Sequence, residues 1–79
     1  GIPLSGYKYP RLIINASMDN ELIIYSYNLS LPVSSVDADR FSIRRGINII
    51  ELDKYRGLIV SFEYREFDRK LLTKIILEN

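Results

Sequence analysis

The sequence contains neither cysteine nor histidine in its 79 residues. The absence of cysteine excludes disulfides and thiol chemistry, so a domain of this size must be held together by packing alone. Without histidine, the chain also lacks the usual ligands of zinc and haem and the base of the common catalytic triads. We therefore expect no catalytic residue, no metal ligand and no cofactor, and a protein that is not an enzyme.

The chain also has little net charge and no long apolar run. Eleven basic and ten acidic residues give a formal net charge of +1, which leaves no basic stripe for a phosphate backbone. No stretch approaches the roughly 18 consecutive apolar residues of a membrane span. We therefore expect neither nucleic-acid binding nor direct membrane insertion within this segment.

Length and composition indicate one folded domain. Apolar residues make up 47% of the chain, which is typical of a globular protein and allows one core. Residues 1–10 contain Pro3 and Pro10, and proline lacks the N–H that a central strand needs. We predict a lead-in segment over 1–10 and a single β-sandwich domain over 11–79.

Short apolar runs rich in β-branched and aromatic residues predict strands. Alternation over residues 21–31 places Ile23, Tyr25 and Tyr27 on one face, which we expect to be the buried face. Residues 58–64 alternate most clearly. The pattern predicts an all-β, small antiparallel β-sandwich of six to seven short strands, with a small β-barrel as the alternative.

The last segment fits two structures. A helix over 68–78 would bring Phe67, Leu71 and Ile75 onto one face, with Asp68 as its N-cap, and would make the fold α+β. A strand would instead align Leu71, Ile75 and Leu77, with residues 66–70 as a hairpin loop. We favour the strand, because the preceding segments are all β and hairpins are the commonest local connection.

The predicted strands define a core and two turn glycines. We expect the apolar faces of the strands to be largely buried, at Leu12, Ile14, Ile23, Tyr25, Phe41, Ile43, Ile50, Leu52, Val60, Phe62 and Ile75. Gly46 and Gly57 stand immediately before strands, where we expect turns with positive φ.

Residues 41–77 contain a pattern of turn and core residues that is found in a known class of domains. Gly46, Asn48, Ile50 and Leu52 form the pattern Gly-x-Asn-x-Ile-x-Leu, and Val60, Phe62, Tyr64 and Thr73 follow it as Val-x-Phe-x-Tyr and a later Thr. This half of the chain resembles the immunoglobulin-like domains of prokaryotic, especially archaeal, surface and envelope proteins. The resemblance implies an immunoglobulin-like sandwich with a scaffold or adhesive role.

Three local patterns have a functional and an ordinary interpretation. Asn15-Ala16-Ser17 and Asn28-Leu29-Ser30 match N-glycosylation acceptors, or are ordinary polar residues. Asp37 and Asp39 form an x-Asp-x-Asp loop, but calcium needs about 6–8 oxygen ligands and no such cluster is visible. The aromatic and basic residues that could stack bases are interleaved with acids, which favours a solvated face; they are Lys54, Tyr55, Arg56, Tyr64, Arg65 and Arg69.

From these observations we expect a non-enzymatic structural or interaction module of an extracellular or cell-envelope protein. It would act through strand-edge and loop contacts with protein, either a second copy or a neighbouring domain or subunit. Isoleucine-rich residues 47–52 would be adhesive if left unpaired. The alternative is an intracellular small β-barrel that binds nucleic acid.

Overall fold

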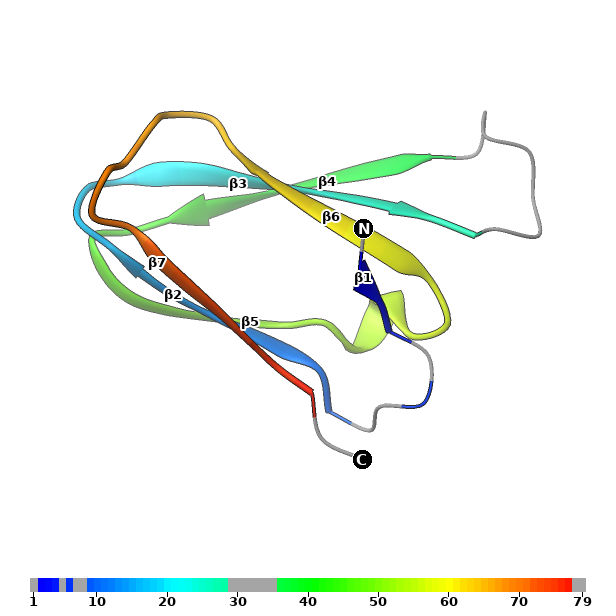
Figure 1. Cartoon of the computed structure of the whole chain (residues 1–79). Helices are drawn as coiled ribbons and strands as arrows, with labels where there is room; N and C mark the ends of the chain where they lie inside the picture. Colours follow the sequence, from blue (N-terminus) through cyan, green and yellow to red (C-terminus); the bar gives the residue numbers. More distant parts are fainter. Residues whose placement is uncertain (1, 5, 7–8, 29–35, 78–79) are drawn as a thin grey trace.

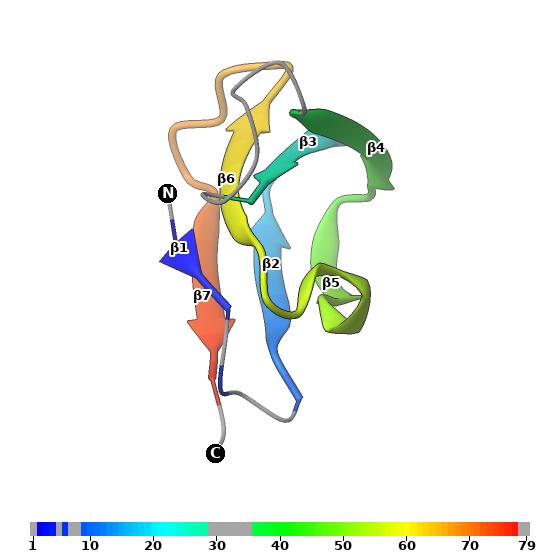
Figure 2. The ribbon, with the colours of Figure 1, turned by 90° about the vertical axis from the view of Figure 1, so that its right-hand side faces the viewer.

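The chain forms two antiparallel sheets packed face to face, as the computed structural model shows for residues 2–4, 6, 9–28 and 36–77 (Figure 1). The strands are β1 (Ile2–Pro3), β2 (Arg11–Ala16), β3 (Asn20–Tyr27), β4 (Asp37–Ile43), β5 (Gly46–Glu51), β6 (Ile59–Tyr64) and β7 (Leu72–Ile76), with a short 3-10 turn, η2 (Asp53–Tyr55), between β5 and β6. One sheet has the order β1-β6-β3-β4 and the other β5-β2-β7. The sheets do not close on each other (Figure 2), so the predicted small β-sandwich is confirmed and the barrel alternative is wrong.

Most connections carry the chain from one sheet to the other. Among the described strands, only β3 and β4 are consecutive in sequence and paired in the same sheet. The hairpin predicted between the last two strands is wrong, because β6 pairs with β3 and β1 while β7 pairs with β2. Periodicity predicts that a segment is a strand, but it does not say which strand lies beside it.

Three strands distinguish this sandwich from an immunoglobulin constant domain. In that domain the sheets are A-B-E-D and C-F-G. The β2·β5 and β3·β6 pairings correspond to B·E and C·F, but β1 lies beside β6, β7 lies beside β2, and β4, in the place of D, lies beside β3 and not beside β5. The position that the last strand of that fold occupies beside F is therefore held here by the two-residue β1.

The C-terminal segment is a strand, as we favoured, and the helix alternative is wrong. β7 aligns with β2 from Arg11 to Asn15. Leu71, Ile75 and Leu77 pack against the core from the predicted face. In the described part of the chain, no helix is long and apolar enough to cross a membrane.

The core face of β3 is the opposite of the one predicted. Leu22 and Ile24 are fully buried in the core, whereas Tyr25 and Tyr27 are half-buried on the outer face. Ile23 is buried, but it lies on that outer face in register with Arg40 and Glu63. Both faces of β3 carry large apolar side chains, so alternation alone did not identify the inner one. Leu29 and Leu31, at the end of the predicted strand, lie outside the described residues.

The remaining core predictions are largely confirmed. The buried members are Leu12, Ile14, Ile43, Leu52 and Val60. The half-buried members that pack against them are Phe41, Ile50, Phe62 and Ile75. The core residues that the sequence analysis missed are Leu4, Ala16, Leu22, Ile24 and Tyr55. Leu4 comes from the lead-in segment, where its N–H donates to the carbonyl of Leu58 at 3.0 Å.

Three of the crossings between sheets meet at one end of the sandwich. They are residues 17–19, 44–45 and 65–71. Asn20 binds the backbone of Glu66 twice, since its Oδ1 accepts from the N–H and its Nδ2 donates to the carbonyl, each at 3.0 Å. Oδ1 of Asp19 accepts a 2.9 Å hydrogen bond from the N–H of Arg45. Asp19 in the first crossing and Asn20, the first residue of β3, therefore bind the other two crossings.

The two predicted turn glycines are confirmed. Gly46 has φ of +103° and Gly57 has φ of +77°, a region that L residues with side chains rarely adopt. Beside Gly46, Asn48 fastens the turn, because its Oδ1 accepts from the N–H of Arg44 at 3.1 Å and its Nδ2 donates to the Arg44 carbonyl at 2.7 Å.

Candidate functional site

β6 is covered along its whole length on one side only. On that side, β3 aligns with every residue from Ile59 to Tyr64. On the other side, β1 aligns with Ile59 and Val60 alone. Within the described residues, no strand lies beside Ser61–Tyr64 on that second side.

The backbone groups on that open edge belong to Phe62 and Tyr64. The N–H of Arg65 donates to the carbonyl of Glu21 at 2.9 Å, toward β3. Because hydrogen bonding alternates along an antiparallel strand, Phe62 and Tyr64 direct their N–H and C=O groups the other way. The open edge thus carries two donors and two acceptors for an added strand.

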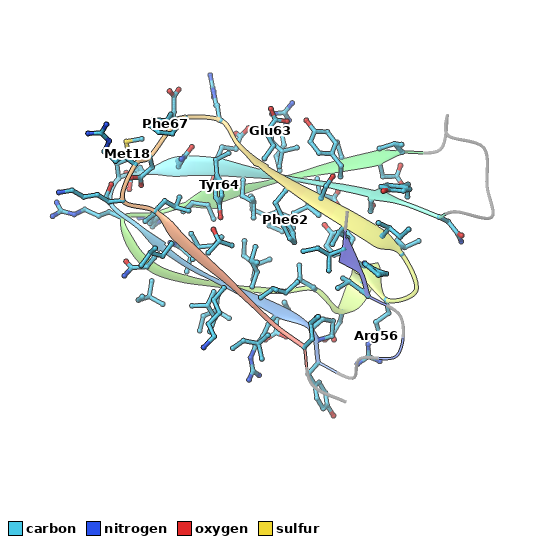
Figure 3. The ribbon with its side chains drawn as sticks, in the orientation of Figure 1. Met18, Arg56, Phe62, Glu63, Tyr64 and Phe67 are labelled. Carbon is cyan, nitrogen blue, oxygen red and sulfur yellow. The ribbon has the colours of Figure 1, made fainter. Side chains whose placement is uncertain are left out.

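The edges of β6 and β7 lie along one side of the sandwich, which we call the open seam: Ser61–Tyr64 of β6 and residues 71–77. Phe62 and Tyr64 extend from β6 between the sheets, while Glu63 points away (Figure 3). Phe62 and Tyr64 are only half-buried. Thr73 is exposed, although it lies on the same face as Leu71, which packs against the core. The Tyr64 hydroxyl and Oγ1 of Thr73 lie 2.6 Å apart and link the sheets across the seam. Partial burial raises the pKa of Tyr64.

The outer face of the three-stranded sheet is a second candidate surface. Its aliphatic members, which we call the aliphatic face, are Ile13, Ile47, Ile49, Leu72 and Ile76. Ile47 is 66% exposed, Ile49 61% and Leu72 69%. Ile13 lies in register with Ile49, and Ile47 lies two residues from Ile49 on the same face, so these three are neighbours on one surface. Leu72 and Ile76 share the face with Asn15, Lys74 and Arg11 between or beside them.

β5 leaves its own backbone edge open beside this face. The N–H of Leu52 donates to the carbonyl of Pro10 at 2.9 Å, so alternation directs the backbone groups of Ile47 and Ile49 away from β2. β5 ends its sheet, with β2 as its only strand neighbour among the described residues. The isoleucine-rich segment that we expected to be adhesive is therefore an edge strand.

Asp37 and Asp39 lie on strand β4 rather than in the predicted loop. Oδ2 of Asp39 accepts a 2.6 Å hydrogen bond from the Tyr55 hydroxyl and lies 3.0 Å from Nζ of Lys54. The Tyr55 hydrogen bond, followed by Lys54, lowers the pKa of Asp39, and burial followed by the Asp39 carboxylate raises that of Tyr55. No cluster of metal-ligating side chains forms among the described residues.

The aromatic and basic residues considered for base stacking do not form one face. The ring of Tyr55 is buried in the core. Lys54 pairs with Asp39, and Arg56 lies 3.4 Å from Oδ1 of Asp53. Arg56 and Tyr64 also lie well apart on the molecule (Figure 3). Both Lys54 and Arg56 therefore lie beside an acid in space, and for Arg56 it is an acid that is also near in the sequence.

The two glycosylation patterns differ in setting. Asn15 is exposed on the outer face of β2, at the centre of the aliphatic face. Ser17 binds Asp68, because its N–H donates to Oδ2 at 2.9 Å and its hydroxyl donates to Oδ1. Asn28 is half-buried at the end of β3, and Leu29 and Ser30 lie outside the described residues. A glycan on Asn15 would cover the protein surface between Ile47 and Leu72.

Comparison with known proteins identifies no relative. No family model matches the chain, and neither a curated protein nor a solved structure is significantly similar to it. Function must therefore be argued from the two surfaces described above.

Proposed function

We propose that this chain is a non-enzymatic structural and interaction module of an extracellular or cell-envelope protein, binding protein partners through unpaired strand edges and nearby loops. The observation that carries the proposal is the aliphatic face beside the open edge of β5. Single exposed apolar residues are ordinary, but a contiguous group on one sheet face is typical of a contact surface.

The two outer strands joined by the turn at 44–45 differ in a way that supports this role. β4 carries Asp37, Asp39 and Arg40, and Nη1 of Arg40 lies 2.7 Å from Oε1 of Glu21. Charges of this kind protect an edge strand from unwanted pairing. β5 has Glu51 as its one charged residue and exposes two isoleucines. The edge that lacks protection is the one we propose to meet a partner.

The envelope setting rests on the resemblance found in the sequence. The resemblance to immunoglobulin-like domains of prokaryotic surface proteins involves Gly46 and Asn48, which build the turn into β5. A sandwich fold hosts many functions, so the fold itself does not decide the setting.

Sedimentation velocity tests the proposal. We expect concentration-dependent association up to about 1 mM, where interactions of about 4 kcal/mol become measurable. The double variant Ile47→Thr/Ile49→Thr keeps β-branched side chains and should abolish that association. Phe67→Ser is the matched control, because it removes an apolar side chain that is 87% exposed but lies on the 65–71 loop. A strictly monomeric wild type would contradict assembly through β5.

Fluorescence anisotropy separates this proposal from nucleic-acid binding. Labelled single-stranded and duplex oligonucleotides should show no binding at physiological ionic strength, since the net charge is only +1 and Lys54 and Arg56 each pair with an acid. Micromolar binding that weakens steeply with salt would favour the intracellular alternative instead.

A further inference from the structure

The outer edge of β5 has the backbone groups that an added strand needs. Ile47 and Ile49 direct their N–H and C=O groups away from β2, in the spacing of an antiparallel ladder. The strands nearest the chain ends, β1 and β7, lie on the other side of the sandwich (Figure 2), so the edge of β5 is not on the line of either. A strand that joins this edge would extend the three-stranded sheet.

Two exposed residues of opposite charge flank the isoleucines of β5. Arg45 precedes the strand and Glu51 is its last residue. Among the described residues, Arg45 forms no ion pair, and Glu51 forms none although it lies in register with Arg11. An antiparallel copy of the same strand presents the two charges in reverse order. The edge is therefore complementary in charge to itself.

One register matches both the apolar and the charged side chains. Because Ile47 and Ile49 both direct their backbone groups outward, odd-numbered residues pair with odd-numbered ones. Pairing Ile47 of one copy with Ile49 of the other also brings Glu51 opposite Arg45, twice by symmetry. Pairing Ile49 with Ile49 would instead place Glu51 opposite Ile47, and pairing Ile47 with Ile47 would place Arg45 opposite Ile49. Of these three registers, only the first leaves no charge opposite an isoleucine.

Arg45 contributes to this contact through its side chain, because its N–H already donates to Oδ1 of Asp19 at 2.9 Å. The new ladder uses the N–H and C=O groups of Ile47 and Ile49 in each copy. Asp19 and Asn48 fix the turn at Arg45 within one copy. A turn that is already ordered loses little conformational freedom when it meets a partner, which favours binding.

We propose that the partner of β5 is a second copy of this chain, in an antiparallel edge-to-edge dimer with Ile47 opposite Ile49 and Arg45 opposite Glu51. The two three-stranded sheets then form one continuous sheet in the order β7-β2-β5-β5-β2-β7. On its outer face, Ile47 and Ile49 of both copies form one cluster, with Ile13 of each copy beside it. The inference rests on the proposed function, because it names the partner and the register of the edge that this function uses.

Charge reversal tests the pairing of Arg45 with Glu51, with sedimentation velocity at low ionic strength as the measurement. Arg45→Glu and Glu51→Arg should each weaken dimerisation at least about tenfold, because each brings like charges together at two places. The double variant Arg45→Glu/Glu51→Arg restores opposite charges and should recover dimerisation. Arg69→Glu, on the 65–71 loop, is the matched control and should leave dimerisation unchanged. A double variant as weak as the single ones would overturn the charge pairing.

Cross-linking reads the register directly, because the chain has no cysteine of its own. Residues opposite each other in a hydrogen-bonded pair have Cα atoms about 5.5 Å apart, within the range of a disulfide. In an oxidised mixture of the variants Ile47→Cys and Ile49→Cys, one of them isotope-labelled, mass spectrometry should find mainly the mixed dimer. Faster cross-linking of either variant to itself would overturn the register.

Amide hydrogen exchange tests whether β5 gains a strand as the dimer forms. Protection of the Ile47 and Ile49 amides should rise with protein concentration, whereas the Asn48 and Ile50 amides, which face β2, should be protected throughout. Equal protection of all four amides in dilute protein would overturn the proposal, because the edge would already be covered.

The outcomes separate this inference from the proposed function. Association that the double variant Ile47→Thr/Ile49→Thr abolishes, but that shows neither charge recovery nor the mixed cross-link, would remove the register and leave binding through β5 standing. A strictly monomeric wild type would overturn both.

Discussion

The hydroxyl group of Tyr55 donates a 2.6 Å hydrogen bond to Oδ2 of Asp39, which joins η2 to the edge strand β4. The tyrosine ring is buried in the core, while the carboxylate also meets Nζ of Lys54 near the surface. A buried hydroxyl without a partner is costly, and here a strand acid supplies the acceptor. Because this contact favours the charged form of Asp39, we expect the stability of the domain to depend on pH.

We predict that acid weakens the domain through Asp39. Its pKa lies below the ordinary 3.8, because Tyr55 and then Lys54 favour the carboxylate. The stabilisation is therefore present above the unfolded-state pKa and is lost as pH falls through the folded-state pKa. Urea denaturation between about pH 5 and pH 1 should show the free energy of unfolding fall.

Asp39→Asn should flatten this fall in part. Asp68, whose pKa is lowered chiefly by the hydrogen bond from Ser17, acts in the same direction, so some acid sensitivity should remain. Asp37→Asn is the control, because it removes a charge from the same strand and makes neither contact with η2. If the two variants behaved alike, Asp39 would have no special part in acid stability.

Because one face of β3 is buried and the other is exposed, we expect substitutions on the two faces to change the free energy of unfolding by different amounts. Leu22→Ala removes a fully buried side chain and should lower the free energy of unfolding by about 2–5 kcal/mol. Tyr25→Phe removes a hydroxyl that bonds Glu63 on the exposed outer face, and should change it by about 0.5 kcal/mol or less. Chemical denaturation of both variants measures the difference. The reverse order would show that the outer face is the true core.

The turn glycines should resist substitution for a backbone reason. A Cβ at Gly46 or Gly57 would meet no atom within 4 Å, so alanine there brings strain and no clash. We expect Gly46→Ala to cost about 1–3 kcal/mol. Gly57→Asn should cost less than Gly57→Ala, because asparagine tolerates positive φ. Thermal denaturation of the three variants measures these costs. An equal loss of stability for Gly57→Ala and Gly57→Asn would contradict the role that we assign to positive φ.

We expect Asn20 to stabilise the end of the sandwich where the three crossings meet. Asn20→Ala removes both hydrogen bonds to the Glu66 backbone and should cost about 1–2 kcal/mol. It should also speed hydrogen exchange at the Glu66 amide. Asn15→Ala is the matched control, since Asn15 is exposed on the outer face of β2 and should change stability by about 0.5 kcal/mol. Equal effects would show that the crossings stand without this contact.

Part of the candidate site could be recognised before the structure was known. The isoleucines at 47 and 49 mark an adhesive strand by composition, and the structure adds that β5 lies at a sheet edge. The open edge of β6 had no such signal. Its alternating apolar pattern is that of any half-buried strand, and only the pairing of the described strands shows that β3 lies along one side of it.

The sequence by itself determined the local features of this protein. Alternation over residues 59–64 and the glycines at 46 and 57 depend on neighbours within a few residues, so strand character and positive φ could be predicted. Tertiary structure decided which face of β3 is buried, because Leu22 and Ile24 meet the core only after the sheets pack. It also decided that β7 lies beside β2 and that Tyr55 reaches Asp39. Those contacts join residues far apart in the chain, and no local pattern records them.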